Sequence, residues 1–200
     1  MTEQEFVAWA YERTRAEWVN GEVTIMSPVN LEHDQLQGWI ARLIADFVEE
    51  NNLGQVCGSE FWLRLPNAKS LRLTDLFFVA TGRESGFQRA SKSNSGPPTC
   101  FNGAPDLIVE IVSDDSVGRD YKQKLKEYES AGVREYWIID PLALKVIANS
   151  YSGKKFHRLP EKKGAIRSKV LPGFFLRPFW LWQKPLPRKS AALQEINEAR

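Results

Sequence analysis

The chain of 200 residues is poor in cysteine, with only Cys57 and Cys100. These residues lie far apart and neither belongs to a CxxC or CxxxH pattern, which excludes a disulfide framework and a structural zinc site. Long apolar runs are also missing. Nowhere do 18 apolar residues follow one another, and the N-terminal MTEQEFVAWAYERT lacks the apolar core of a signal peptide. We therefore expect a cytoplasmic protein that does not enter a membrane.

Acidic residues are scarce in one part of the chain. Residues 1–150 contain 15 Lys and Arg against 22 Asp and Glu, whereas residues 151–190 contain 11 against one. Such a basic segment can attract a polyanion such as nucleic acid, but it is more often a solvated face, so both interpretations stay open. Aromatic residues in such a segment usually belong to a core or a docking surface. Here they are Phe174, Phe175, Phe179, Trp180 and Trp182.

Hydrophobic periodicity predicts the elements of the N-terminal half. Residues 4–13 have helical spacing, and Asn20-Gly21 between two apolar runs predicts a β-hairpin. After candidate caps at 27–30, apolar residues at helical spacing predict an amphipathic helix of about five turns, ending near residues 51–54. Two further strands are predicted at 55–65 and 71–80, followed by a long flexible loop at 81–98.

The second half predicts a βαβ unit. Residues 105–113 are typical of a buried strand, residues 117–131 of a helix that ends at Gly132, and residues 135–140 of another strand. This order indicates a right-handed crossover between two parallel strands. Residues 144–159 are expected to add an edge hairpin.

These elements predict an α/β fold with a mixed sheet flanked by helices, preceded by an N-terminal helix and β-hairpin. We expect a single domain over residues 1–183 and a loosely ordered C-terminal tail over residues 184–200.

Two carboxylates fall on apolar strand faces. Asp75 shares a face with the apolar side chains of segment 73–79, and Glu110 does the same in segment 106–112. A buried carboxylate needs a cation, hydrogen bonds or a metal. Lys124 lies on the helical stripe that should face the sheet, where a right-handed crossover brings its ammonium near both acids. Two acids and a lysine on a mixed sheet are typical of metal-dependent phosphodiester hydrolysis.

Each of these residues also has a structural interpretation. Asp75 can cap a turn or pair with Arg72. Glu110 can form a structural ion pair with Lys124, whose side chain can alternatively extend past the neighbouring tyrosines to solvent.

Four stretches carry a family resemblance: Val19-Asn-Gly-Glu-Val-Thr-Ile-Met-Ser-Pro28 with the following His33, Leu73-Thr-Asp-Leu-Phe-Phe-Val79, Gly103-Ala-Pro-Asp-Leu-Ile-Val-Glu-Ile-Val-Ser113, and Asp120-x3-Lys124-x3-Tyr128-x3-Gly132-Val-x-Glu-Tyr-Trp-Ile-Ile-Asp-Pro141. Over roughly residues 5–160, the sequence resembles the Uma family of putative restriction endonucleases, members of the PD-(D/E)xK nuclease superfamily. The resemblance implies a restriction-endonuclease-like fold.

The resemblance also implies roles for the three residues. Asp75 becomes the first metal-binding acid, Glu110 the second, and Lys124 the active-site lysine. Two positions depart from the superfamily pattern: Thr74 stands in place of proline, and Val112 in place of the usual lysine. The lysine function is then expected to have moved to the helix that carries Lys124.

Three further residues are candidate accessory residues. Glu22 is either an additional acid of the metal site or a solvated hairpin residue. His33 is either a packed, hydrogen-bonded histidine or a proton shuttle or phosphate contact. Asp106 lies only four residues before Glu110, which is too close for the usual first acid, and is expected at the rim of the site.

Together these inferences predict a Mg²⁺-dependent endonuclease, with Mn²⁺ as a substitute ion, the Ile111 carbonyl as a third ligand and no organic cofactor. By resemblance, its DNA product would carry a 5′-phosphate and the protein would act as a homodimer. Residues 151–190 and Lys92 would contact DNA phosphates. The alternatives are a catalytically silent nucleic-acid-binding or interaction protein on the same scaffold, and a structural protein in which the acids and the lysine form a buried ion network.

Overall fold

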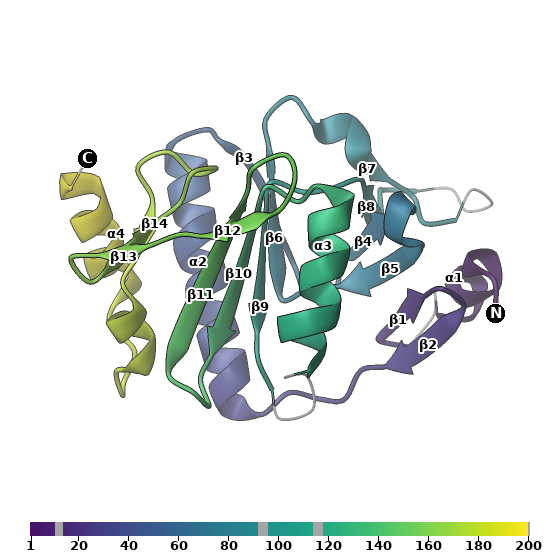
Figure 1. The fold of residues 1–200 in the computed structure, drawn as a ribbon, viewed down its shortest axis with the longest axis horizontal. Coiled ribbons are helices and arrows are strands. Elements are labelled where there is room, and N and C mark those ends of the chain that lie inside the picture. The colour runs from purple at the N-terminus through teal and green to yellow at the C-terminus, as the bar shows by residue number, and fades with distance from the viewer. Residues whose placement is uncertain (11–13, 92–95, 114–117, 200) are drawn as a thin grey trace.

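The computed structural model describes residues 1–10, 14–91, 96–113 and 118–199, which form two six-stranded sheets, a small three-stranded sheet and flanking helices (Figure 1). The α-helices are α1 (Glu3–Ala10), α2 (Leu31–Glu50), α3 (Leu125–Ala131) and α4 (Lys189–Glu198). Shorter helical segments are η1 (Pro66–Ala68), η2 (Glu84–Gly86), η3 (Arg119–Lys124) and η4 (Pro178–Trp182).

The central sheet has the strand order β12-β11-β10-β9-β6-β3. Its members are β3 (Gly54–Gly58), β6 (Leu76–Ala80), β9 (Leu107–Ile111), β10 (Glu135–Asp140), β11 (Lys145–Tyr151) and β12 (Phe156–Arg158). Strands β9 and β10 are parallel and the other neighbours antiparallel, so the predicted mixed sheet, its βαβ crossover and its edge hairpin are confirmed.

Helices cover both faces of the central sheet (Figure 1). Helix α2 begins at its predicted cap, where Asn30 accepts a hydrogen bond from His33 N at 2.8 Å, and its apolar stripe packs on one face with Val109 and Ile111. Helix α3 packs on the other face, where Tyr128 contacts the cluster that contains Ile108. The side chains of β9 therefore alternate between two apolar layers.

The second six-stranded sheet has the order β2-β1-β5-β4-β8-β7. Its members are β1 (Ala16–Val19), β2 (Glu22–Ile25), β4 (Trp62–Leu65), β5 (Ser70–Leu73), β7 (Phe87–Gln88) and β8 (Cys100–Asn102). Asn20 and Gly21 form the predicted two-residue hairpin turn, with φ values of 51° and 97° that this turn requires. Helix α1 packs beside this hairpin, so the predicted N-terminal helix and hairpin are confirmed.

The two strands predicted at 55–65 and 71–80 are each divided between the two sheets. In the second of them the chain leaves β5 at Leu73 and enters β6 at Leu76, so Asp75 lies at the junction of the sheets rather than inside a strand. The prediction that Asp75 shares one strand face with Leu73 and Phe77 is therefore wrong. Leu73 packs in the cluster beside α1, whereas Phe77 packs beside α3.

Two further segments differ from the sequence expectation. The segment expected as a flexible loop at 81–98 contains η2 and β7, and β7 pairs with β8, while residues 92–95 lie outside the described part of the chain. The helix expected at 117–131 begins with a π-helical segment, η3, and continues as α3 to the predicted end at Gly132, which has a φ of 81°. Residues 114–117 also lie outside the described residues.

The C-terminal segment is more ordered than expected. Residues 161–176 form the small sheet β13 (Glu161–Lys162), β14 (Ala165–Arg167) and β15 (Phe175–Leu176). In place of a loosely ordered tail, α4 packs against the core with Ala192 and Ile196 buried, because these two residues lie on one face of the helix. Among the described residues, no helix is both long and apolar enough to cross a membrane.

Candidate active site

Glu110 lies on β9, and Asp75 directly precedes β6, the neighbouring strand of the central sheet. Leu76 of β6 pairs with Val109 of β9, and continuing this register by one residue places Asp75 opposite Glu110. The Asp75 carboxylate takes the place of a backbone partner, since its Oδ2 accepts a hydrogen bond from Ile111 N at 2.6 Å. The sheet junction therefore positions the first predicted acid beside the second.

The Asp75 segment is held by the first turns of α2. His33 Nε2 lies 3.1 Å from Asp75 Oδ1, and the Gln37 amide donates to the Asp75 carbonyl at 2.9 Å. Because His33 is buried and Asn30 caps its backbone, the imidazole has a defined position. His33 is thus a packed, hydrogen-bonded histidine, and its partner is the first predicted acid.

Glu110 is held from the opposite face of the sheet by the helix that follows it. Lys124 Nζ lies 3.0 Å from Glu110 Oε1, and the Tyr128 hydroxyl donates to the same oxygen at 2.8 Å. Burial and the charge of Glu110 raise the pKa of Tyr128 well above 10, so this hydroxyl stays protonated and remains a donor. Lys124 is only 5% exposed, which rules out the interpretation that its side chain extends to solvent.

Another buried acid near these residues, Glu17 on β1, was missed by the sequence analysis. Its Oε2 accepts from Arg72 Nη1 at 2.8 Å and its Oε1 from Leu73 N at 3.1 Å. Arg72 also binds both carboxylate oxygens of Glu127 on α3, at 3.2 and 2.5 Å. The pairing suggested for Asp75 is therefore made by Glu17 and Glu127 instead. The signal was present in the apolar strand Ala16–Val19, where a carboxylate is as unusual as at Asp75.

Electrostatics connect Glu17 to the lysine of the site. Burial by itself raises the pKa of Glu17, but the positive charge of Lys124 and then that of Arg72, together with the hydrogen bonds from Arg72 and Leu73, hold this pKa below its usual value. Glu17 is only 1% exposed, and because its pKa is lowered it is ionised although it is buried. Its charge is balanced by cations of two different elements.

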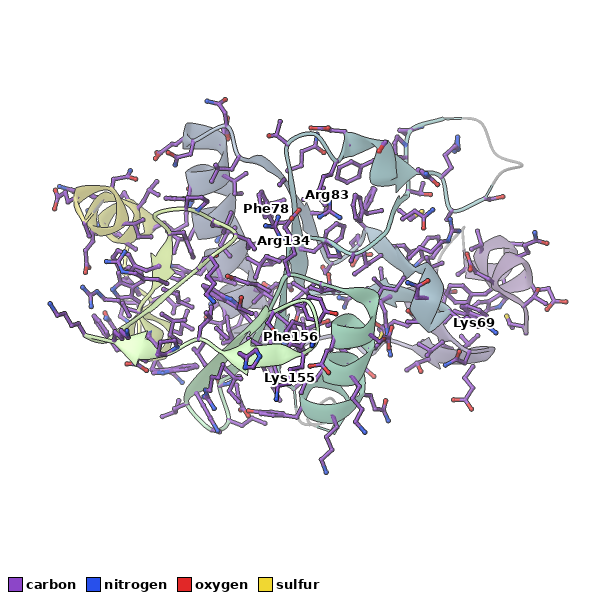
Figure 2. All side chains as sticks on the ribbon, turned by 45° about the horizontal axis from the view of Figure 1, so that its top comes forward. Lys69, Phe78, Arg83, Arg134, Lys155 and Phe156 are labelled. Atoms are coloured by element: carbon purple, nitrogen blue, oxygen red, sulfur yellow. The ribbon has the colours of Figure 1, made fainter. Side chains whose placement is uncertain are left out.

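The other two accessory candidates lie elsewhere. Glu22 is exposed on β2, as the interpretation of a solvated hairpin acid predicts. Asp106 is fully buried and binds Arg83 Nη1 at 2.7 Å and Arg134 Nη1 at 2.9 Å; Figure 2 shows these two arginines side by side. Four residues of extended strand, about 13 Å, separate Asp106 from Glu110, so Asp106 is an ion-pair centre at the other end of β9.

The predicted DNA-contacting segment, residues 151–190, begins at the end of the sheet that lies away from Glu110. Outside this segment, Lys145 lies opposite Asp140 in the strand register, at the end of β10 near Glu110, and its side chain is exposed. The turn at residues 152–155 lies at the opposite end of the sheet (Figure 1), because Ser150 is level with Glu135 and Leu107. Lys92 lies outside the described residues. Most aromatic residues of this segment are core residues, except that Phe179 is 52% exposed.

The donor set fits a hard divalent cation. Among the described residues, no three His, Cys, Asp or Glu side chains are grouped to hold a metal without other ligands. Mg²⁺ is usually held by one or two carboxylates and keeps waters or substrate phosphates as its remaining ligands, which matches the pair of Asp75 and Glu110. In the described part of the chain, buried His33 Nδ1 has no hydrogen-bond partner, as expected where water completes a polar site.

Comparisons with known proteins agree with this architecture. The family model Uma2, described as "Putative restriction endonuclease", matches residues 3–174. The fold is similar to the crystal structure of a putative nuclease belonging to DUF820 from Anabaena variabilis ATCC 29413, with a TM-score of 0.73, 17% sequence identity, and coverage of 91% of this chain and 97% of that chain. No curated protein matched the sequence.

The structural likeness establishes the restriction-endonuclease-like fold, while the family model spans most of the chain, including the two segments that carry the acids and the helix that carries the lysine. This chain therefore belongs to the Uma2 family of putative restriction endonucleases.

Proposed function

We propose that this protein is a Mg²⁺-dependent endonuclease that hydrolyses phosphodiester bonds of DNA. The observations that carry the proposal are the contact of buried Lys124 with buried Glu110 and the strand register that, continued by one residue, brings buried Asp75 level with Glu110. Membership of the Uma2 family supports a nuclease rather than another phosphodiesterase. Divalent metals are general in restriction-endonuclease-like proteins, and the two carboxylates supply the oxygen ligands that Mg²⁺ prefers.

In this proposal Asp75 and Glu110 hold the cation, with the Ile111 carbonyl as a further ligand. A bound Mg²⁺ would polarise the phosphate and lower the pKa of a water molecule. His33 orients the Asp75 carboxylate, and the Tyr128 hydroxyl orients that of Glu110. These contacts fix the direction of the carboxylate oxygens before substrate arrives, which is how an active site avoids reorganisation during reaction.

Lys124 supplies the remaining positive charge. Its ammonium lies beside Glu110, where it can orient the attacking water and stabilise the negative charge that develops on the phosphate. A lysine placed on the helix performs this role as well as one on the strand if the ammonium reaches the same position, which accounts for Val112 in place of the usual lysine.

DNA is the proposed substrate, and exposed lysines near the site are the proposed phosphate contacts. Lys122 and Lys126 are exposed on the π-helical segment and α3, and Lys145 is exposed at the same end of the sheet. The cations of residues 151–190 extend this surface. Such contacts position the DNA backbone without reading its sequence. We further propose a homodimer that cuts both strands. Sedimentation of the purified protein measures its oligomeric state.

The test is cleavage of supercoiled plasmid by purified protein in EDTA, Mg²⁺ or Mn²⁺. Wild type is expected to nick the plasmid only with a divalent metal, and Asp75→Asn is expected to lose both nicking and the calorimetric signal of Mn²⁺ binding. Glu22→Gln is the matched control, because it neutralises an exposed acid without touching the site. DNA binding without cleavage, unchanged by Asp75→Asn, would instead favour the silent nucleic-acid-binding protein.

A further inference from the structure

Glu17 connects the two halves of the candidate site. Through Leu73 N it holds the end of β5, two residues before Asp75, and through Arg72 it is joined to Glu127 on α3. The same helix presents Tyr128 to Glu110, and Lys124 directly precedes it. One carboxylate of the N-terminal hairpin thus links the segment of the first acid to the helix of the lysine.

The charges along this connection alternate in sign. Glu127, Arg72 and Glu17 form one continuous set of ion pairs, and Lys124 and Glu110 form the next pair. Arg72 is shared by two carboxylates, and its partner Glu127 lies on the helix that directly follows Lys124. Lys124 contacts Glu110, and its positive charge also helps to lower the pKa of Glu17. Lys124 is therefore attracted by two buried carboxylates.

A cation at the site changes this balance. Once Glu110 binds a divalent ion, the attraction between Glu110 and Lys124 weakens, while the attraction of Glu17 for the ammonium persists. Glu17 lies on the hairpin, outside the pair of predicted metal ligands, and its hydrogen bonds to Arg72 and Leu73 keep it in place.

We propose that Glu17 is a positioning residue of the active site, which retains Lys124 beside Glu110 when a cation binds and fixes the approach of the chain to Asp75. The proposal rests on the proposed function, because it assigns Glu17 a part in that same site. Without the charge of Glu17, Lys124 pairs more strongly with Glu110, and a divalent ion must displace a tighter ion pair.

The experiment compares Glu17→Gln with Glu3→Gln in the full-length protein. Both variants replace an acid that pairs with an arginine of the same sheet, but the partner of Glu3 is Arg64, which has no described contact with α3. For Glu17→Gln we expect Mn²⁺ affinity, measured by calorimetry, to fall about tenfold, a change equivalent to about 1.4 kcal/mol. We expect kcat on plasmid to fall by a similar factor with little change in KM, because Glu17 acts through Lys124 and does not contact DNA.

A double-mutant cycle separates positioning from a general loss of structure. If Glu17 acts through the lysine, then Glu17→Gln in the Lys124→Met background causes no further loss of Mn²⁺ affinity. Fully additive losses, or an equal loss in Glu3→Gln, would overturn the proposal. Failure of wild type to bind metal or to cut DNA would overturn the proposed function itself, whereas normal metal binding and cleavage in Glu17→Gln would overturn the role of Glu17 alone.

Discussion

The Lys124 ammonium lies 3.0 Å from Glu110 Oε1, with both side chains buried between α3 and the sheet. If this ammonium stabilises the reacting phosphate, Lys124→Met lowers the rate of plasmid cleavage by a factor on the order of 10²–10³, as removal of one transition-state donor does elsewhere. Lys69→Met is the control, because Lys69 is exposed and is not among the proposed phosphate contacts. Equal rates for both variants would show that a different residue performs the lysine function.

Lys145 and Lys155 allow a direct test of where DNA binds. Both are exposed, but Lys145 lies at the end of the sheet that carries Glu110 and Lys155 at the other end. Lys145→Glu is expected to weaken DNA binding severalfold and to reduce its salt dependence, because a phosphate contact is lost, while Lys155→Glu has a smaller effect. Fluorescence anisotropy over a range of salt concentrations measures both. A larger effect at Lys155 would place the DNA at the opposite end.

Glu135 predicts a specific pH dependence of stability. It is fully buried and accepts hydrogen bonds from the Trp137 indole, the Ser168 hydroxyl and the Lys169 backbone, but burial outweighs these bonds and raises the pKa of its carboxyl above 4.5. The folded state thus holds this proton more tightly than the unfolded state. Its contribution to stability is complete below the unfolded pKa and is lost as pH rises through the folded pKa.

The measurement for Glu135 is urea unfolding of wild type and Glu135→Gln at several pH values above and below 4.5. The free energy of unfolding of wild type relative to the variant should decrease as pH rises above 4.5, because only wild type has this carboxyl to ionise. A difference that stays constant with pH would contradict the prediction.

Helix α4 predicts a stability effect at the C-terminus. Ile196 is fully buried in the same core cluster as the apolar face of α2. Ile196→Ala is expected to reduce the free energy of unfolding by about 2–4 kcal/mol, the usual cost of truncating a buried isoleucine. Leu193→Ala, at a partly buried position on the same helix, should cost less. Chemical denaturation distinguishes this outcome from the negligible effect expected in a loose tail.

The sequence predicted elements whose signal is local. The Asn20-Gly21 turn, the long helix capped by Asn30 and the αL residue Gly132 each depend on neighbouring residues alone, and all three are confirmed. The break at Thr74–Asp75 was missed because continuous apolar residues on both sides are typical of one strand, while the division between two sheets depends on distant partners. Helix α4 was missed for a similar reason, since its apolar residues are few and need the surface of α2 to be buried.

In the candidate site too, the sequence identified residues from local signals but not their distant partners. Unusual charges in apolar segments identified Asp75, Glu110 and Lys124, because the cost of burying charge is visible in the sequence. The partners of those charges were not visible: the contact of His33 with Asp75 and the link from Glu17 through Arg72 to Glu127 join residues far apart in the chain. Asp106 satisfied the same rule as Glu110, yet its partners are two arginines at the other end of the strand.

The passage of the chain from one sheet to the other at Thr74–Asp75 has a mechanical consequence. Asp75 is tied to the central sheet by its hydrogen bond from Ile111 N, whereas Leu73, only two residues earlier, belongs to the second sheet. A rotation of one sheet against the other therefore pulls on Thr74 and on the contact that aligns Asp75 with β9. Substitutions in the packing between the sheets, such as at Phe77 or Phe101, can retune the spacing of the acids while leaving every charged group intact.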